Sequence, residues 1–475
     1  MRKGIIISKI VIASMLAVIL GLLVWFGASF SANINAYIGG IKKEDKIHFI
    51  NVISSDSILV ESNGEYGLID ASYSKDDPTS HNINSNGTVV LNYLKKMGVN
   101  HLKFVIATHP HKDHVGGIPE IVNNSNLVNE NTTFIYKDVV MIPTEDEEYY
   151  KHQVGYYKTS NSGNFEEENA FRNAKQAMIS KKAVMLDTLS INKAALRKLN
   201  AKISDDSNVW NKYLTFQMGD YNIKIYNLNL YTEMFRNETF VEINSNSYVI
   251  LITSKDGTNI LLMGDSTVRN KNEIYYGELI GKVDIYKASH HGCIDANSKN
   301  LIETIRPSYT VVTNTSESAL SKGFGAPYTY INNYGGKVFF TGNSEVIFNL
   351  TNKLFVEKGK SYTDSVKEGF YEWYQNVDNK NIKNTYYIRD NIFLSGLQKI
   401  GNNYYIFDND GKRLLGWQIV NNELYYFEPY SESNIGSMYI NTKKYINGHK
   451  YKFNKKGVCE SSNCKTILNN LKKTN

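Results

Sequence analysis

The 475-residue sequence is poor in cysteine, in histidine and in clustered positive charge. Its 3 cysteines form no CxxC pair, which excludes the cysteine-based zinc motifs. The net charge of +6 is spread along the chain without a block of lysine or arginine, which argues against a dedicated nucleic-acid-binding arm. No G-x-S-x-G stretch is present, so the sequence does not indicate a serine nucleophile on a strand–helix elbow.

Long hydrophobic runs are also absent, except at the N-terminus, where an uncharged run covers residues 10–30. Its length is about the 20 apolar residues that a membrane-spanning helix needs, and three basic residues precede it on the side expected to stay in the cytoplasm. Residues 1–35 therefore predict a basic tip and a single signal anchor, with the rest of the chain outside the membrane. Cleavage within residues 27–36, followed by secretion and association with the cell wall, is the alternative.

The cysteines leave two interpretations open. Cys459 and Cys464 are close enough in "VCESSNCK" to close a small disulfide loop in an oxidising compartment, or they are two spare thiols. Cys293 stands alone.

Three of the 10 histidines fall in one stretch, "ATHPHKDHVGG" at 107–117. This stretch begins at the C-terminal end of "LKFVIATH", an apolar run typical of a strand buried on both faces. It therefore lies where α/β folds place their chemistry. Alternate residues near a strand end point the same way, so His109 and His111 can hold one metal ion. Asp113 and His114, on the following turn, can face a second ion about 3.5–4 Å away.

Such a pair of ions needs a bridging carboxylate and a further histidine from elsewhere in the chain. Asp265 in "LLMGDS" and the pair His290–His291 in "ASHHG" follow predicted strands and meet both needs. Taken singly, Asp265 fits a turn and the histidine pair fits a surface loop. Their order and their shared position at strand ends favour a metal centre. Alternation along the strand does not decide between His290 and His291.

Strand and helix patterns predict an α/β fold. A strand-like segment at 48–60 and a second strand ending at Asp70 precede an amphipathic helix in "TVVLNYLKKMG". After an insertion at 137–211, further strands are predicted in "YNIKIYNLNL", "SYVILITSKDG", "TNILLMGDS" and "KVDIYKASHHG". Strands followed by helices in both halves predict two sheets flanked by helices, an αββα sandwich over residues 45–357.

The composition changes after this region to short aromatic units. Phe407, Phe427 and Phe453 recur at intervals of 20 and 26 residues, with polar turns and Asp-Gly or Asn-Gly between aromatic clusters. Units this short indicate stacked hairpins, because each is too small to bury its own face. The predicted parts are a linker at 358–390, a β-hairpin repeat module at 391–460 and a tail at 461–475.

The motif THxHxDHxGG, followed by GD and then by HHG, resembles the metallo-β-lactamase superfamily, in the branch that includes the DNA-uptake metallohydrolases. The resemblance covers about residues 48–351. The stretches "SDSILVESNGEYGLIDAS", "NSNSYVILI" and "LIGKVDIYKASHHG" are similar to the phosphorylcholine esterases of Gram-positive cell surfaces. In those proteins a domain of this fold precedes aromatic choline-binding repeats, which is the order of the two parts here.

The resemblance implies roles for individual residues. It implies that the site binds two divalent metal ions, of zinc, and that their ligands are His109, His111, Asp113, His114, Asp265 and His291. The spacing from Asp265 and the match around HHG favour His291 over His290 as the ligand. By the same resemblance, Asp70 and Thr108 hold the histidine loop from behind, and Asp113 and His290 act on the substrate.

One histidine of the family pattern, between the first loop and Asp265, is missing. The resemblance puts Thr215 or a neighbour, in "YLTFQMGD", at its position. His152 is the other candidate, although "EEYYKHQVGYY" has the pattern of an exposed helix. Without this ligand three outcomes are open: the first ion binds weakly, a water takes the place of the histidine, or the site works with one metal ion. Lys287, two positions before "SHHG", is interpreted as a strand lysine whose amine reaches the solvent.

These features predict an extracytoplasmic, metal-dependent phosphodiesterase that acts on phosphorylcholine-bearing teichoic acid. A secreted nuclease of the DNA-uptake type, and a surface-binding protein with a weakened site, are the alternatives; nucleic acid is the less favoured partner. The repeats are expected to bind a cell-wall polymer or choline through cation–π contacts of Trp417, Tyr425 and Tyr426, unless these aromatics only form the hairpin core.

Overall fold

The computed structural model describes residues 43–83, 85–138, 166–230, 232–235, 238–241, 243–269, 272–378, 380–431 and 433–474. The predicted membrane anchor and His152 lie outside these residues. Within them, no helix combines the length and the apolar content needed to cross a membrane.

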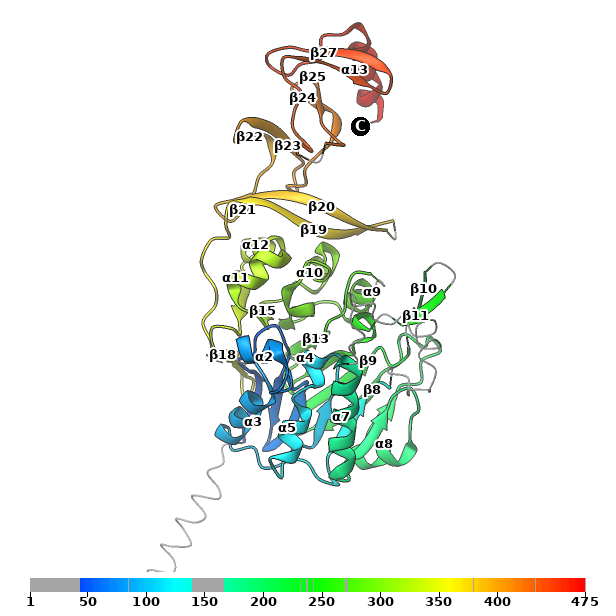
Figure 1. Cartoon of the computed structure of the whole chain (residues 1–475), viewed down its shortest axis with the longest axis vertical. Helices are drawn as coiled ribbons and strands as arrows, with labels where there is room; N and C mark the ends of the chain where they lie inside the picture. The colour runs from blue at the N-terminus through cyan, green and yellow to red at the C-terminus, as the bar shows by residue number, and fades with distance from the viewer. Residues whose placement is uncertain are drawn as a thin grey trace, which may run out of the picture.

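Two eight-stranded sheets form the centre of the α/β domain (Figure 1). The first sheet is antiparallel at one end and parallel from β3 to β6. Its strands in spatial order are β18 (Phe355–Lys358), β17 (Val346–Asn349), β1 (Asp45–Phe49), β2 (Ile58–Ser62), β3 (Glu65–Ile69), β4 (Phe104–Ile106), β5 (Thr133–Tyr136) and β6 (Val184–Asp187).

The second sheet has the same mixed character, since β13 to β16 are parallel and the others antiparallel. Its strands in spatial order are β16 (Lys337–Phe340), β15 (Tyr309–Val312), β14 (Ile285–Lys287), β13 (Asn259–Leu262), β12 (Val249–Thr253), β9 (Tyr221–Tyr226), β8 (Leu214–Met218) and β7 (Lys202–Ile203). A separate hairpin is formed by β10 (Thr232–Phe235) and β11 (Glu238–Val241).

Helices cover the outer faces of both sheets, and one helix, Lys193–Leu199, packs instead into the apolar cluster between them. Around the first sheet lie α2 (Pro78–Ile83), α3 (Gly87–Lys96), α4 (Lys112–Val115), α5 (Ile118–Asn123), α7 (Glu166–Ser180) and α8 (Lys193–Leu199). Around the second lie η1 (Asn244–Asn246), α9 (Asn272–Ile280), η2 (Ser289–Gly292), α10 (Lys299–Ile305), α11 (Ser316–Ala319), η3 (Leu320–Phe324) and α12 (Gly325–Asn333). One apolar cluster fills the space between the sheets and two others lie beneath the helices, so the predicted αββα sandwich is confirmed.

Local sequence explains these elements where it carries the expected signals. The amphipathic helix predicted from "TVVLNYLKKMG" is α3, which begins at Asn86, whose side chain accepts hydrogen bonds from the Thr88 and Val89 amides. The prediction of a single strand at 48–60 is wrong. This segment contains two antiparallel strands, β1 and β2, because the polar stretch "NVISSDS" turns the chain back at 51–57.

The expected β-hairpin repeats are confirmed at the C-terminal end. A sheet of β19 (Gly369–Val377), β20 (Lys380–Arg389) and β21 (Ile392–Phe393) comes first and crosses above α10 and α12 in Figure 1. The hairpins that follow are β22–β23 (Gly396–Ile400, Asn403–Phe407), β24–β25 (Gly416–Val420, Glu423–Phe427) and β26–β27 (Thr442–Ile446, His449–Phe453).

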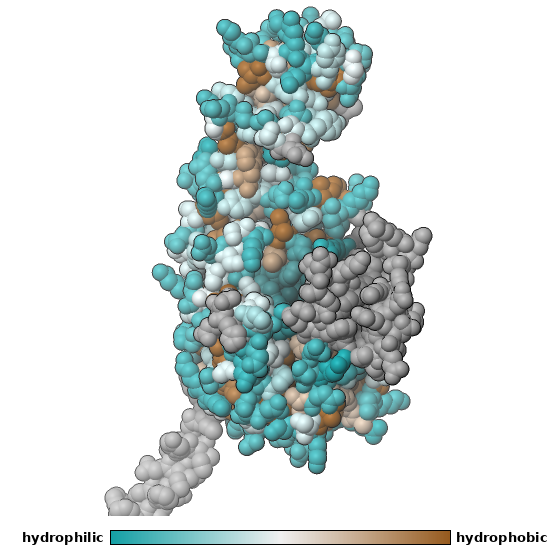
Figure 2. Space-filling model, viewed as in Figure 1, coloured by the Kyte–Doolittle hydropathy of each residue, from teal (hydrophilic) through white to brown (hydrophobic). Residues whose placement is uncertain are grey.

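The chain ends in α13 (Ser462–Thr474), whose apolar side packs on the last two hairpins. Cys459 and Cys464 are joined by a disulfide, and Cys293 is a free thiol. The repeat module also presents exposed apolar side chains, among them Leu397 and Leu415. On the face of the molecule drawn in Figure 2, hydrophobic surface occurs in small separate patches rather than in one continuous area.

Candidate metal centre

Three strand ends deliver the polar side chains of the site to one place. The loop after β4 carries His109 and His111 and leads into α4, which carries Asp113 and His114. In the second sheet, Asp265 follows β13, and His291 lies in η2 just after β14. Parallel strands place their carboxyl ends at the same edge of each sheet, and the packing of the two sheets on each other brings the loop after β4 to the loops after β13 and β14.

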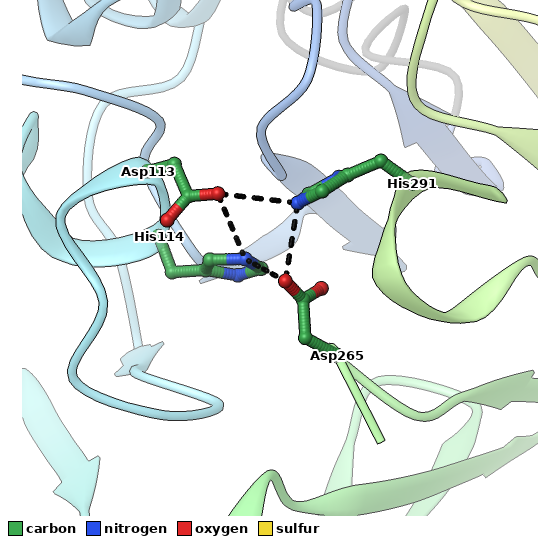
Figure 3. A group of neighbouring side chains, drawn as sticks. All are labelled: Asp113, His114, Asp265 and His291. Atoms are coloured by element: carbon green, nitrogen blue, oxygen red, sulfur yellow. Dashed lines mark hydrogen bonds and ion pairs between the residues drawn. The ribbon is translucent and has the colours of Figure 1, made fainter. Parts of the chain in front are cut away.

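The first group of side chains consists of Asp113, His114, Asp265 and His291 (Figure 3). His291 Nε2 lies 3.2 Å from Asp113 Oδ2 and 3.2 Å from Asp265 Oδ2. His114 Nε2 lies 3.2 Å from the same Asp265 oxygen and 3.7 Å from Asp113 Oδ2. Figure 3 shows these four side chains pointing inward from three segments, with Asp113 and His114 on the same one, so their donor atoms face a common point.

The second group consists of His109, His111 and again Asp265. His109 Nε2 lies 2.9 Å from His111 Nδ1 and 3.9 Å from Asp265 Oδ2. Asp265 therefore belongs to both groups, which is the position that a carboxylate bridging two ions would take. The six predicted ligands are all brought together.

Asp70 and Thr108 brace the histidine loop from behind. Both Asp70 and Thr108 are buried, and Asp70 accepts hydrogen bonds from the Thr108 amide at 2.8 Å and from its hydroxyl at 2.7 Å. Asp70 Oδ2 also lies 2.8 Å from His114 Nδ1, so the carboxylate fixes the ring with Nε2 directed into the first group.

Sequence reasoning missed a second buried carboxylate, Asp56, in the loop between β1 and β2. Asp56 Oδ1 lies 3.2 Å from His291 Nδ1 and accepts a hydrogen bond from the Thr313 hydroxyl at 2.6 Å. Its partner is Lys287, whose amine lies 2.5 Å from Asp56 Oδ2 and 3.7 Å from Asp265 Oδ1. The expectation of a solvent-reaching Lys287 is wrong, because this side chain is fully buried and is held inside by the two carboxylates.

The buried histidines and carboxylates of the site shift one another's pKa values. Burial opposes ionisation of Asp265, but His291 and His114 hold the pKa of its carboxyl well below the usual range. Burial likewise disfavours protonated His114, yet Asp265 and Asp70 hold the pKa of this ring well above its usual value. By contrast, burial and the neighbouring His114 place the pKa of His109 well below its usual value, so His109 is ready to donate a lone pair.

The donor set fits divalent metal ions. Imidazole and carboxylate are the ligands that Zn²⁺ and related ions take in hydrolases. Among the residues that the structure describes, His114 Nε2 and Asp265 Oδ1 are buried without a hydrogen-bond partner. Buried polar atoms are seldom left in this state, and a bound ion would satisfy His114 Nε2.

His290 occupies a different position from His291. Its ring is partly exposed, its Nδ1 lies 2.8 Å from Asp295 Oδ1, and its Nε2 is 3.9 Å from Asp265 Oδ2. It belongs to neither group of candidate ligands. This geometry agrees with His291 as the ligand and leaves His290 beside the site, partly exposed.

Thr215 is not part of the site, and the expectation that it takes the missing histidine's place is wrong. It lies on β8, near the outer edge of the second sheet, and its hydroxyl donates to Asn222 at 3.0 Å. The segment that lines the histidine loop is 245–248 instead: the Tyr248 amide donates to the Thr108 carbonyl at 2.9 Å, and Ser247 accepts from the Asp265 amide at 3.1 Å.

The predicted ligand-binding aromatics of the repeats lie in the second short hairpin. Tyr425 and Tyr426 are buried, and they point to opposite faces of the strand, into different apolar clusters. Trp417 is half-buried and packs edge-on against Tyr426 at 4.8 Å and Tyr451 at 5.0 Å between ring centroids. These aromatics form hairpin core, and Trp417 keeps part of its surface exposed.

Comparison with known proteins finds a matching family for each of the two parts of the chain. The metallo-beta-lactamase superfamily model matches residues 50–148, and the choline-binding repeat model matches residues 394–442. Recombination protein 2 of Haemophilus influenzae is 37% identical over 70 residues, which make up 14% of this chain and 8% of that protein. The chain thus matches less than a tenth of this curated relative.

Two solved structures illustrate the likeness of each part. The metallo-beta-lactamase fold protein YhfI from Bacillus subtilis is 12% identical, covers 65% of this chain and 100% of its own, and has a TM-score of 0.33. A choline-binding domain from Streptococcus pneumoniae is 26% identical, covers 14% of this chain and 97% of its own, and has a TM-score of 0.13. By the family models, the chain is similar to the metallo-beta-lactamase superfamily over residues 50–148 and to choline-binding repeats over residues 394–442, and the α/β domain holds side chains suited to metal binding.

Proposed function

We propose that this chain is a metal-dependent phosphodiesterase of the cell surface, and that its substrate is a phosphorylcholine-bearing wall polymer such as teichoic acid. The observation that carries the proposal is the sharing of Asp265 between two groups of buried histidines and carboxylates. Two divalent ions held there would supply a water activated at neutral pH and positive charge for the phosphodiester.

The chain's own residues have separate tasks in this proposal. His109, His111 and Asp265 hold one ion, and Asp113, His114, Asp265 and His291 hold the other. Behind them, Asp70 and Asp56 keep the rings of His114 and His291 oriented by contacts at 2.8 and 3.2 Å. His290, held by Asp295 and partly exposed, contacts the substrate phosphate.

The repeats are proposed to retain the protein on choline-bearing polymers. The choline-binding repeat match at 394–442 supports this assignment, and the exposed part of Trp417 supplies a ring face for a quaternary ammonium. Together with the predicted signal anchor, this match supports a position of the α/β domain on the outer side of the cell membrane, or on the wall after cleavage.

A nuclease is the second candidate, favoured by the 70-residue match to a recombination protein. One set of measurements separates the two: metal content of the full chain, and turnover of p-nitrophenyl phosphorylcholine, bis-p-nitrophenyl phosphate and single-stranded DNA. We expect about two ions per chain and turnover of the choline ester. Cleavage of DNA alone would favour the nuclease, and an absence of both metal and turnover would refute an enzyme.

Matched variants make this test specific. Asp265→Ala is expected to abolish turnover and to lower the bound metal below one ion per chain, because both groups lose a ligand. Asp220→Ala is the control, since its carboxylate lies 3.9 Å from the exposed Lys255 amine and outside the site. For the repeats, Trp417→Ala should weaken retention on choline resin more than Trp417→Phe, which keeps an aromatic face; Trp210→Phe in the α/β domain should leave retention unchanged.

A further inference from the structure

The loop that carries His291 adopts an unfavourable backbone conformation. His290 has φ 49° and ψ 45°, and His291 has φ 51° and ψ 25°, so two consecutive residues with side chains lie in the left-handed region. Residues other than glycine adopt this region at a cost and usually singly. Such a conformation persists only where the surroundings hold it, so the contacts of this loop are decisive for where His291 points.

Asn297 holds the start of the loop. Its Oδ1 accepts hydrogen bonds from the Ser289 amide at 3.0 Å and the Tyr286 hydroxyl at 2.9 Å, and its Nδ2 donates to the Ser289 carbonyl at 2.9 Å. Asn297 is fully buried and has a left-handed φ of 60° itself. The backbone of Ser289, directly before the two histidines, is therefore clamped on both its amide and its carbonyl side.

The support for Asn297 comes from outside the sandwich. Trp373, in the long hairpin β19–β20, donates a hydrogen bond from Nε1 to the Asn297 carbonyl at 2.7 Å. Trp373 is only 2% exposed and packs against Tyr330 and Tyr386, with ring centroids 5.5 and 6.0 Å away. A residue 76 positions further along the chain thus completes the contacts behind the histidine loop.

Further contacts fix the same hairpin to the α/β domain. Asn376 and Asn300 form a reciprocal pair, in which the Asn376 amide donates to Asn300 Oδ1 at 2.7 Å and Asn300 Nδ2 donates to the Asn376 carbonyl at 3.2 Å. Asn381 Nδ2 donates to the Val268 carbonyl. Trp373 shares one apolar cluster with residues of α10 and α12, so the hairpin is docked along its length.

We propose that the β19–β20 hairpin is a positioning element for the metal site, and that Trp373 and Asn297 are positioning residues that hold His291 towards Asp113 and Asp265. The proposal rests on the proposed function only in taking metal binding as the task of His291; the contacts that hold the loop do not depend on it. The hairpin lies between the α/β domain and the repeats, so the part of the chain that leads to the wall-binding module also completes the support of the site.

The test uses Trp373→Phe in the full chain, which removes the Nε1–H donor and keeps an aromatic ring in the apolar cluster. Hydrogen–deuterium exchange is measured on the metal-free protein, so the result does not depend on activity. We expect amide exchange in residues 288–298 to become about tenfold faster, because one buried hydrogen bond behind the loop is lost. Trp417→Phe in the distal hairpin is the matched control and should leave this segment unchanged.

Asn297→Ala keeps the test decisive if the first variant has a small effect. It removes both side-chain contacts to Ser289, so exchange in residues 288–298 should increase more than in Trp373→Phe. Both variants should also weaken cobalt binding by about tenfold and change its visible absorption, which reports ligand geometry. Unchanged exchange in both variants would overturn the proposal. Faster exchange in a chain that hydrolyses nothing would leave it standing and reject the proposed function.

Discussion

Replacing Lys287 by methionine tests the electrostatic design of the site. The Lys287 amine has no exposed surface and lies between Asp56 and Asp265, 2.5 and 3.7 Å from their nearest oxygens. Methionine has a similar length and no charge, so Lys287→Met leaves two buried carboxylates without this cation. Breaking a buried ion pair on one side costs about 3–5 kcal/mol.

The cost should depend on metal. In the metal-free chain, a loss of this size lowers Tm by about 6–10 °C, at about 2 °C per kcal/mol for a large domain. Bound zinc supplies positive charge beside Asp265, so the difference from the wild type should shrink when zinc is added. The zinc-induced rise in Tm should therefore be larger in Lys287→Met than in the wild type.

Thermal unfolding in EDTA and in a zinc series measures both effects. Lys255→Met is the matched control, because Lys255 is 80% exposed and its pair with Asp220 is 3.9 Å long; its Tm should change by less than about 1 °C. The double variant Asp56→Asn with Lys287→Met should recover part of the loss, since one of the two buried charges is then removed. Equal Tm values for Lys287→Met and the wild type in EDTA would refute the reasoning.

Three further outcomes are expected. His291→Ala should lose about one bound ion by metal analysis, whereas His290→Ala should keep the full metal content and lose turnover; equal metal loss in both would contradict the assigned positions. Burial raises the pKa of Glu273 from 4.5 to about 8, so the folded chain keeps a proton that the unfolded chain releases. The free energy of unfolding should consequently fall between pH 4.5 and 8, and urea unfolding of Glu273→Gln should show this slope removed. Replacing Cys459 and Cys464 by serine should destabilise the repeat module by about 2 kcal/mol, seen as a lower transition in calorimetry while the α/β domain's transition stays in place.

The ligand loop was predictable from the sequence because its chemistry is local. His109, His111, Asp113 and His114 lie within six positions after one buried strand. Asp265 and the pair His290–His291 were predictable for a related reason, since each follows an apolar run that predicts a strand; the choice of His291 came from its spacing from Asp265 and from the family resemblance. Parallel strands bring the ends within each sheet to one edge, and the packing of the two sheets on each other then brings Asp265 and His291 to the histidine loop.

The supporting residues could not be found in this way. Asp56 stands in a polar stretch that resembles an ordinary loop, and its role arises only from Lys287 and His291, more than 200 positions away. Lys287 offered one signal, a charge in the apolar run "VDIYKAS", which is compatible with a buried partner as well as with solvent.

The region expected as a linker, residues 358–390, contains a β-hairpin that its composition alone does not indicate. Residues 369–377 and 380–389 pair in register around a turn at Asp378, which has a left-handed φ of 49°. The turn "VDNK" between two aromatic, β-rich runs is a hairpin pattern. Composition does not separate this hairpin from the repeats, because aromatic hairpins occur both in the docked sheet and beyond it.

The docked hairpin also bears on how such two-part proteins can be shuffled. A recombination event that joins this α/β domain to a different surface-attachment module would have to fall after Arg389, the last residue of β20. A junction at the change in composition near residue 358 would remove Trp373 and expose the apolar surfaces of α10 and α12 that it covers. The segment that would have to be transferred together is thus longer than the sandwich, and a graft designed from composition alone would separate the α/β domain from part of its own core.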